Sequence, residues 1–154
     1  LEGGEAMAET ISFLSQRGIP VMAHIGLTPQ AVNALGGYGA RGRSQEEHAK
    51  IISDGKAVQE AGAFAVVVEG VVEPIAVSLT QSLEIPVIGI GASAHCDGQV
   101  LVVDDMLGMF ERVPRFVKKY GNLAEEITDK VQQYASEVRA RSFPTEDQTY
   151  QPKS

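Results

Sequence analysis

The 154-residue sequence lacks several features that would assign it to a function class. It has one cysteine, Cys96, so it forms no intrachain disulfide and suits a reducing compartment. Its 13 basic residues are outnumbered by 20 acidic ones and form no basic stripe, which argues against nucleic acid as a partner. No uncharged apolar run approaches the ~18 residues that a membrane span needs, and no signal peptide opens the chain. We therefore expect a cytoplasmic protein without nucleic-acid or membrane partners.

Apolar runs and helical periodicities alternate along the chain, which is typical of a parallel α/β fold. The predicted strands cover residues 19–25, 63–69 and 85–91, and the valine-rich run 100–103 is a candidate fourth strand. The predicted helices cover residues 5–16, 29–35, 44–61, a stretch from 73 and a stretch from 122. Ser44 and Glu47 have the spacing of a capping box, and Asn122 is expected to cap the last helix.

The number of strands bears on the architecture, because a closed βα barrel needs eight strands and about 250 residues. This chain offers three strands and a candidate fourth, and it does not begin with methionine. It is either a smaller open sheet or the second half of a barrel, and the missing methionine favours the second. We expect residues 1–141 to form the C-terminal half of a single (β/α)8 barrel domain and residues 142–154 to form a C-terminal tail.

Candidate catalytic residues follow from the rule that parallel α/β folds place their active sites at the carboxyl ends of strands. Glu69 ends a run of three valines, so partial desolvation should raise its pKa, as a general base requires. The alternative is a strand-end glutamate paired with lysine or arginine. His24 lies near the end of the first strand. It is either a metal ligand, a hydrogen-bond donor to a bound carboxylate, or a core histidine with both nitrogens satisfied. Glu2 lies where a further strand would end.

Two loops also invite a functional interpretation. His95, Cys96 and Asp97 are consecutive, but adjacent residues rarely all face one ion and no second cluster has zinc spacing. We interpret that run as a structured loop beside the substrate. The glycine-rich, basic segment 36–43 matches neither the dinucleotide nor the Walker pattern. It is either a weak phosphate cradle or a lid whose arginines meet solvent or a neighbouring subunit.

Several longer motifs occur in the order seen in ketopantoate hydroxymethyltransferases, and the sequence resembles this family from Leu1 to about Tyr150. The most specific motifs are Leu1-Glu2-Gly3-Gly4, His24-Ile25-Gly26-Leu27-Thr28-Pro29-Gln30, Gly36-Gly37-Tyr38, Val68-Glu69, Gly89-Ile90-Gly91-Ala92 and His95-Cys96-Asp97-Gly98-Gln99.

The resemblance implies a (β/α)8 barrel of the phosphoenolpyruvate/pyruvate superfamily. It implies transfer of a hydroxymethyl group from 5,10-methylenetetrahydrofolate to 3-methyl-2-oxobutanoate, with a magnesium ion held by the substrate's oxygens. By position, Glu69 matches the family's proton acceptor, His24 a substrate-pocket residue and Glu2 the acidic residue at the metal. The family also implies a homo-oligomer, with a decamer expected, and a place in pantothenate and coenzyme A biosynthesis.

The chain departs from the family's pattern in ways that affect these expectations. A lysine that binds the substrate carboxylate and two metal-binding aspartates lie upstream of Leu1 in the family, so we expect this chain alone to be inactive. Ser93-Ala94 replaces a glycine–proline pair, and Gly70-Val71 replaces Cys-Val. Two alternatives stay open: another 2-oxo acid carbon–carbon lyase or transferase of the superfamily, and an inactive half-barrel that serves as a binding module.

Overall fold

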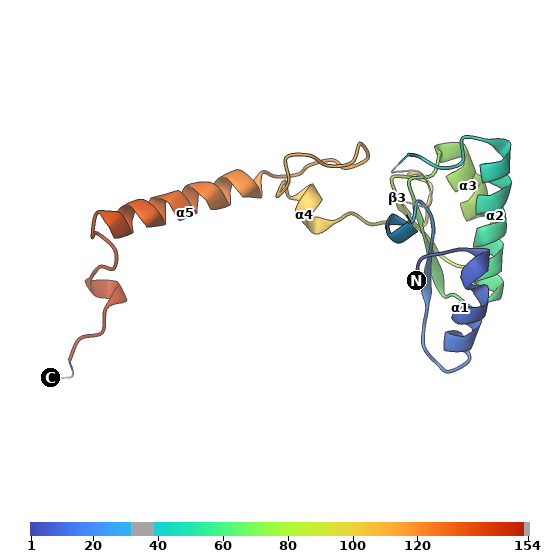
Figure 1. Cartoon of the computed structure of the whole chain (residues 1–154), viewed down its shortest axis with the longest axis horizontal. Coiled ribbons are helices and arrows are strands. Elements are labelled where there is room, and N and C mark those ends of the chain that lie inside the picture. Colours follow the sequence, from blue (N-terminus) through green and yellow to red (C-terminus); the bar gives the residue numbers. More distant parts are fainter. Residues whose placement is uncertain (32–38, 153–154) are drawn as a thin grey trace. The chain divides into compact units, whose positions relative to one another are not determined.

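The computed structural model describes residues 1–31 and 39–152, and the chain divides into two compact units, Leu1–Leu101 and Val102–Ser154 (Figure 1). The first unit contains, in chain order, η1 (Glu5–Met7), α1 (Ala8–Ser15), β1 (Met22–Gly26), η2 (Pro29–Ala31), α2 (Gln45–Glu60), β2 (Ala65–Glu69), α3 (Glu73–Ser82), β3 (Val87–Ile90) and β4 (Gly98–Gln99). The second contains α4 (Val103–Met106), α5 (Leu123–Arg139) and η3 (Glu146–Gln148).

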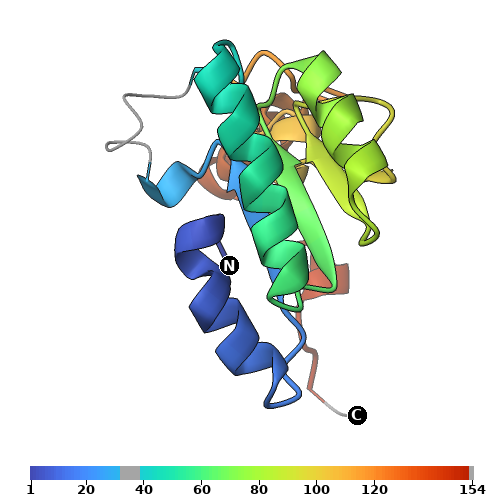
Figure 2. The ribbon, with the colours of Figure 1, turned by 90° about the vertical axis from the view of Figure 1, so that its right-hand side faces the viewer.

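The four strands form one sheet in the order β1-β2-β3-β4, and every neighbouring pair is parallel. Helices α1, α2 and α3 lie side by side over one face of it (Figure 2). Successive strand residues point to opposite faces, so the helix-covered face receives the small and β-branched side chains. The fully buried residues here include Ala23, Val66, Val68, Val87 and, from α3, Leu79. The predicted parallel α/β class is confirmed.

The other face of the sheet carries the chemically interesting residues. The strand register places His24 opposite Val67, and Val67 opposite Ile88. One row further toward the carboxyl ends, Glu69 lies opposite Gly26 and Ile90. His24 and Glu69 therefore share one face on neighbouring strands, offset by two residues.

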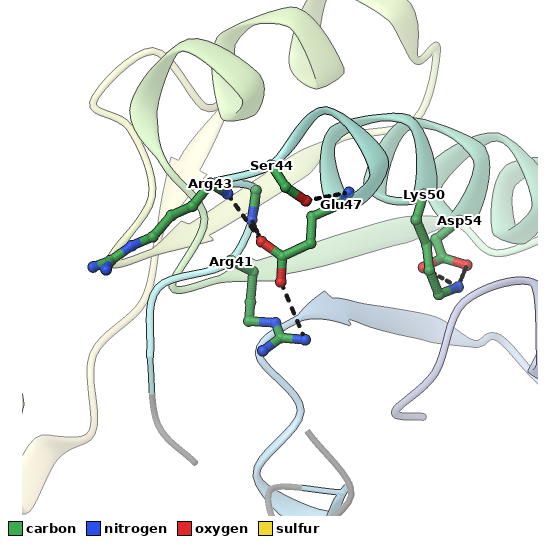
Figure 3. Close-up of polar contacts among 7 residues, drawn as sticks. Arg41, Arg43, Ser44, Glu47, Lys50 and Asp54 are labelled. Carbon is green, nitrogen blue, oxygen red and sulfur yellow. Dashed lines mark hydrogen bonds and ion pairs between the residues drawn. The ribbon is translucent and has the colours of Figure 1, made fainter. Parts of the chain in front are cut away.

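Helix α2 begins as the capping-box spacing predicts, but only half of the box forms. The Ser44 Oγ accepts a hydrogen bond from the Glu47 backbone N–H at 3.1 Å. The Glu47 carboxylate reaches past Ser44 and accepts from the backbone N–H groups of Gly42 at 3.0 Å and Arg43 at 2.9 Å (Figure 3). Glu47 thus fixes the segment that enters the helix.

One local prediction is wrong, and a second is correct in position only. The candidate strand at 100–103 does not form: β4 is two residues long, Gly98 and Gln99, and Val103 begins α4. The valines favour a strand by composition, but acidic Asp104 and Asp105 favour a helix N-terminus instead. Asn122 occupies the N-cap position of α5, as predicted, but its side chain makes no capping hydrogen bond, and its amide donates to the Glu125 carboxylate.

The short helix expected over 29–35 is a single 3₁₀ turn, Pro29–Ala31, and its remaining residues lie outside the described part. The domain boundary at residue 141 stays a prediction. Within the described ranges, no helix is both long enough and apolar enough to cross a membrane.

Helix α5 of the second unit has apolar residues along one side that are exposed to solvent. Ile127, Val131, Tyr134 and Val138 are 47%, 60%, 55% and 42% exposed, respectively. No residue of α5 is buried. Spacings of three and four residues place these side chains on one helix face.

Candidate active site

Glu69 and His24 meet at the carboxyl edge of the sheet, as the strand-end rule predicts. The Glu69 Oε2 lies 3.1 Å from the His24 Nε2, and the two side chains are only 13% and 19% exposed. Glu69 comes from the end of β2 and His24 from the middle of β1, so the parallel register brings the two together. The alternative expectation, a lysine or arginine partner for Glu69, is not what the described residues show: the group in contact with its carboxyl is the His24 imidazole.

The His24 imidazole retains unused hydrogen-bonding capacity. Its Nε2 is buried, yet it has no hydrogen-bond partner of acceptable angle within the described residues, because the contact with Glu69 is close in distance but poor in direction. A core histidine would have both nitrogens satisfied, so this interpretation of His24 is wrong. The substrate-binding role of His24 stays a prediction.

The environment of Glu69 favours its neutral form. Burial raises the pKa of the Glu69 carboxyl, and the charge of Glu2 acts in the same direction, while the His24 imidazole opposes the shift. The net direction is upward, as predicted from the valine run before Glu69. A carboxyl with a raised pKa is a better proton acceptor near neutral pH than an ordinary surface glutamate.

Glu2 is the third predicted site residue, and it lies beside β1. Backbone bridges join Glu2 and Gly3 to His24, with hydrogen bonds from Gly3 N to His24 O and from His24 N to Leu1 O, both 2.9 Å. The Glu2 Oε2 accepts from the Gln30 backbone N–H at 3.0 Å. The first residues of the chain thus pair with β1 as a neighbouring strand would.

The structure does not supply a complete magnesium site. Among residues 1–31 and 39–152, no three His, Cys, Asp or Glu side chains form a group that could hold a metal ion. Glu69 places a carboxylate 3.1 Å from His24, and Glu2 pairs with His24 through its backbone, but the three described side chains do not form such a ligand group. The described residues by themselves therefore do not fit the ion.

The loop after β3 is structured, as predicted. The Asp97 Oδ2 accepts from the Val87 N–H at 2.8 Å, and the Ser93 Oγ accepts from the His95 N–H at 3.1 Å. The Gln99 amide donates to the Ser93 carbonyl at 2.7 Å. Asp97 thus has a structural role, because its carboxylate holds the first residue of β3. Its place beside a substrate stays a prediction.

Residues 41–43 are anchored beside Glu69, which could not be predicted from the sequence. The Arg41 N–H donates to the Gly70 carbonyl at 2.7 Å, and the Val72 N–H donates to the Arg41 carbonyl at 3.0 Å. The Arg41 guanidinium also lies 3.4 Å from the Glu47 carboxylate (Figure 3). For Arg41, the expectation of an arginine that meets solvent or another subunit is therefore replaced by an ion pair within the chain. The capping-box spacing was the only available signal for Glu47.

A parallel α/β sheet that brings a buried carboxyl and an imidazole together at its carboxyl edge is typical of the class of α/β enzymes, whose active sites lie at the strand ends. The family described as ketopantoate hydroxymethyltransferase matches residues 1–146, and the chain belongs to this family of transferases.

Three relatives show how closely the chain matches. It is 70% identical over 153 residues to the 3-methyl-2-oxobutanoate hydroxymethyltransferase of Erythrobacter litoralis, 69% over 153 residues to that of Novosphingobium aromaticivorans, and 65% over 150 residues to that of Sphingopyxis alaskensis. These alignments cover 97–99% of the chain but only 52–53% of each relative. The chain thus spans about half the length of the curated relatives it matches, which agrees with the predicted half-barrel.

Proposed function

We propose that the whole protein to which these residues belong transfers a hydroxymethyl group from 5,10-methylenetetrahydrofolate to 3-methyl-2-oxobutanoate. The product is 2-dehydropantoate, and the reaction belongs to pantothenate and coenzyme A biosynthesis in the cytoplasm. The observation that carries this proposal is the Glu69–His24 pair at the strand ends, in a chain whose relatives bear the name of that activity.

In the proposed reaction, Glu69 is the base. Its carboxylate takes the proton from C3 of 3-methyl-2-oxobutanoate, and the electrons of that C–H bond move onto the carbonyl oxygen to form an enolate. C3 of the enolate then forms the new carbon–carbon bond to the methylene carbon donated by the folate. The bonds from that carbon to the folate nitrogens break, water supplies the hydroxyl of the hydroxymethyl group, and tetrahydrofolate leaves. Burial supports this role of Glu69, because it raises the pKa of the carboxyl toward the range in which a base works well.

His24 is proposed to bind the substrate. The buried Nε2 without a well-directed partner supports this role, because a ligand oxygen would satisfy it. The backbone of His24 is fixed on both sides, by β2 and by the Leu1–Gly3 segment, so the imidazole starts from a rigid element. A donor held in this way is pre-organised for its ligand.

Magnesium belongs to the proposal for the whole protein only. Glu2 would supply one ligand, and the remaining ligands would come from residues outside this chain. The base and donor roles of Glu69 and His24 do not depend on where that ion lies.

We also propose that the protein assembles as a homo-oligomer, with a decamer as the expected size. The exposed apolar side of α5 supports assembly, because an apolar stripe of this kind is a common interaction surface. Light scattering at micromolar concentration tests it, and a monomer would contradict it.

The test of the base is Glu69→Gln in the full-length protein. Exchange of the C3 proton of 3-methyl-2-oxobutanoate with solvent deuterium is followed by NMR, and we expect it to fall by about 10²–10⁴-fold. Substrate binding, measured by titration, should be retained. Glu73→Gln is the matched control, since Glu73 is exposed at the start of α3 and should leave exchange unchanged. Undiminished exchange in Glu69→Gln would refute the base assignment.

A further inference from the structure

Helix α2 carries a buried carboxylate that the proposed chemistry does not use. Asp54 is 8% exposed, and within the described part of the chain it is the one buried acidic residue. Both of its oxygens lie 2.9 Å from the Lys50 Nζ, one turn earlier on the helix (Figure 3). Burying a carboxylate is costly unless it is well bonded, so the groups that Asp54 holds indicate why it is there.

The second partner of Asp54 belongs to the segment that carries Glu2. The Asp54 Oδ1 accepts a hydrogen bond from the backbone N–H of Glu5 at 2.9 Å, across 49 residues of sequence. The Glu5 N–H belongs to the first residue of η1 and has no acceptor within that helix. The bond therefore ties the start of η1 to the middle of α2.

Gly4 shows how closely the segment and the carboxylate approach each other. A Cβ on residue 4 would lie 2.1 Å from both the Cγ and the Oδ1 of Asp54. Real Cβ atoms do not come that near to other heavy atoms, so a side chain on residue 4 would displace either the carboxylate or the segment.

The opposite end of the same segment is held by β1. Gly3 donates to the His24 carbonyl, and His24 donates to the Leu1 carbonyl. Glu2 therefore lies between two anchors, the backbone of His24 on one side and the carboxylate of Asp54 on the other.

We propose that Asp54 is a positioning residue of the active site, which holds Gly4 and Glu5 so that Glu2 stays beside His24. This inference rests on the proposed function, since it gives Glu2 a place in that site. The ion pair with Lys50 does not explain why Asp54 is buried. The Lys50 side chain is 68% exposed, and an ion pair so open to solvent adds little stability. Lys50 compensates the buried charge, and the directed bond to Glu5 does the positioning.

The first test measures amide hydrogen exchange in the full-length protein with Asp54→Ala. We expect the Gly3 and His24 amides to exchange about tenfold faster or more, the change that follows the loss of one hydrogen bond to a charged group. The Val66 amide, which bonds to Pro86 on the far side of β2, should keep its protection. Glu60→Ala is the control, because it removes an exposed acid from the end of the same helix.

The second test is kinetic and uses C3 proton exchange. Asp54→Ala should lower kcat at least tenfold and leave KM nearly unchanged, since Asp54 does not touch the substrate. Asp54→Asn should recover part of the loss, because the amide oxygen can still accept from Glu5. It also serves where the alanine variant does not fold.

Unchanged protection of Gly3 and His24 in the Asp54 variants would overturn the proposal. An equal acceleration at Val66 would overturn it as well, since it would indicate a general loss of stability. Failure of the proposed function would appear separately, as undiminished proton exchange in Glu69→Gln, whereas the amide measurement does not require the reaction.

Discussion

Replacing Glu47 by alanine tests how firmly residues 41–43 are held at the strand ends. The carboxylate accepts two backbone hydrogen bonds, from Gly42 and Arg43, and forms an ion pair with Arg41. The Glu47 side chain is 33% exposed, so each hydrogen bond contributes about 1 kcal/mol and the ion pair less than that. We expect Glu47→Ala to lower the free energy of unfolding of the first unit by about 2 kcal/mol at pH 7.

The loss should depend on pH in a defined direction. The N–H group of Arg43 and the charge of Arg41 hold the pKa of Glu47 below its usual value. The unfolded chain therefore takes up this proton first, so the stabilisation is present above the unfolded pKa and is lost as the pH falls through the folded one. The difference between the parent protein and Glu47→Ala should be greatest above about pH 5 and shrink in acid.

Hydrogen exchange across a urea series at two pH values measures this effect. The Arg41 and Val72 amides report the anchored segment, because they bond to Gly70 and to Arg41 respectively, and the Val66 amide reports the sheet. Glu47→Gln, which keeps one acceptor oxygen and loses the charge, should show an intermediate effect. Glu46→Ala, an exposed neighbour in the same helix turn, should show little. A loss of equal size at both pH values would refute the reasoning, and so would no loss at pH 7.

Three further predictions concern stability and assembly. Because burial raises the pKa of Glu69, the stability from that group is present below the unfolded pKa and is lost as the pH rises through the folded pKa. Glu69→Gln should therefore gain stability relative to the parent as the pH rises from acid to neutral, and a Tm difference that does not grow over this range would contradict it. Leu79 is fully buried, so Leu79→Ala should cost about 3 kcal/mol in urea unfolding, and a loss below about 1 kcal/mol would show that the site collapses around the gap. Val131 is 60% exposed on α5, so Val131→Asp should leave helicity by circular dichroism unchanged but reduce the oligomer size by light scattering; an unchanged size would assign assembly to another surface.

The parts of the site that could be predicted from the sequence are those governed by general rules of parallel sheets. Glu69 follows a valine run, and His24 lies in a neighbouring strand. The rule that parallel strands place their carboxyl ends at one edge was therefore enough to predict that the two side chains lie close together. The raised pKa of Glu69 followed from the same valines. The direction of the His24 Nε2 was not predictable, because it depends on side-chain geometry.

The remaining features depend on packing between distant segments. The bond from Glu5 to Asp54 spans 49 residues, and it forms only because α2 packs against η1. In the sequence, Lys50 and Asp54 have the spacing of an ordinary surface pair, with nothing to indicate that the acid is buried. The failed strand at 100–103 has a related cause, since β-branched residues form a strand only where packing and pairing favour it.

The close approach of Gly4 and Asp54 also limits how this part of the chain can vary. The carboxylate occupies the volume that a side chain on residue 4 would need, so neither position can change freely while the other stays the same. The three heavy atoms nearest to a Cβ on residue 4 are the Cβ, Cγ and Oδ1 of Asp54, at 2.1–2.4 Å. A Gly4→Ala change that is damaging alone should therefore be better tolerated together with Asp54→Gly, which removes all three atoms. The two positions form an epistatic pair, in which the order of substitutions decides whether a route between two functional sequences is open.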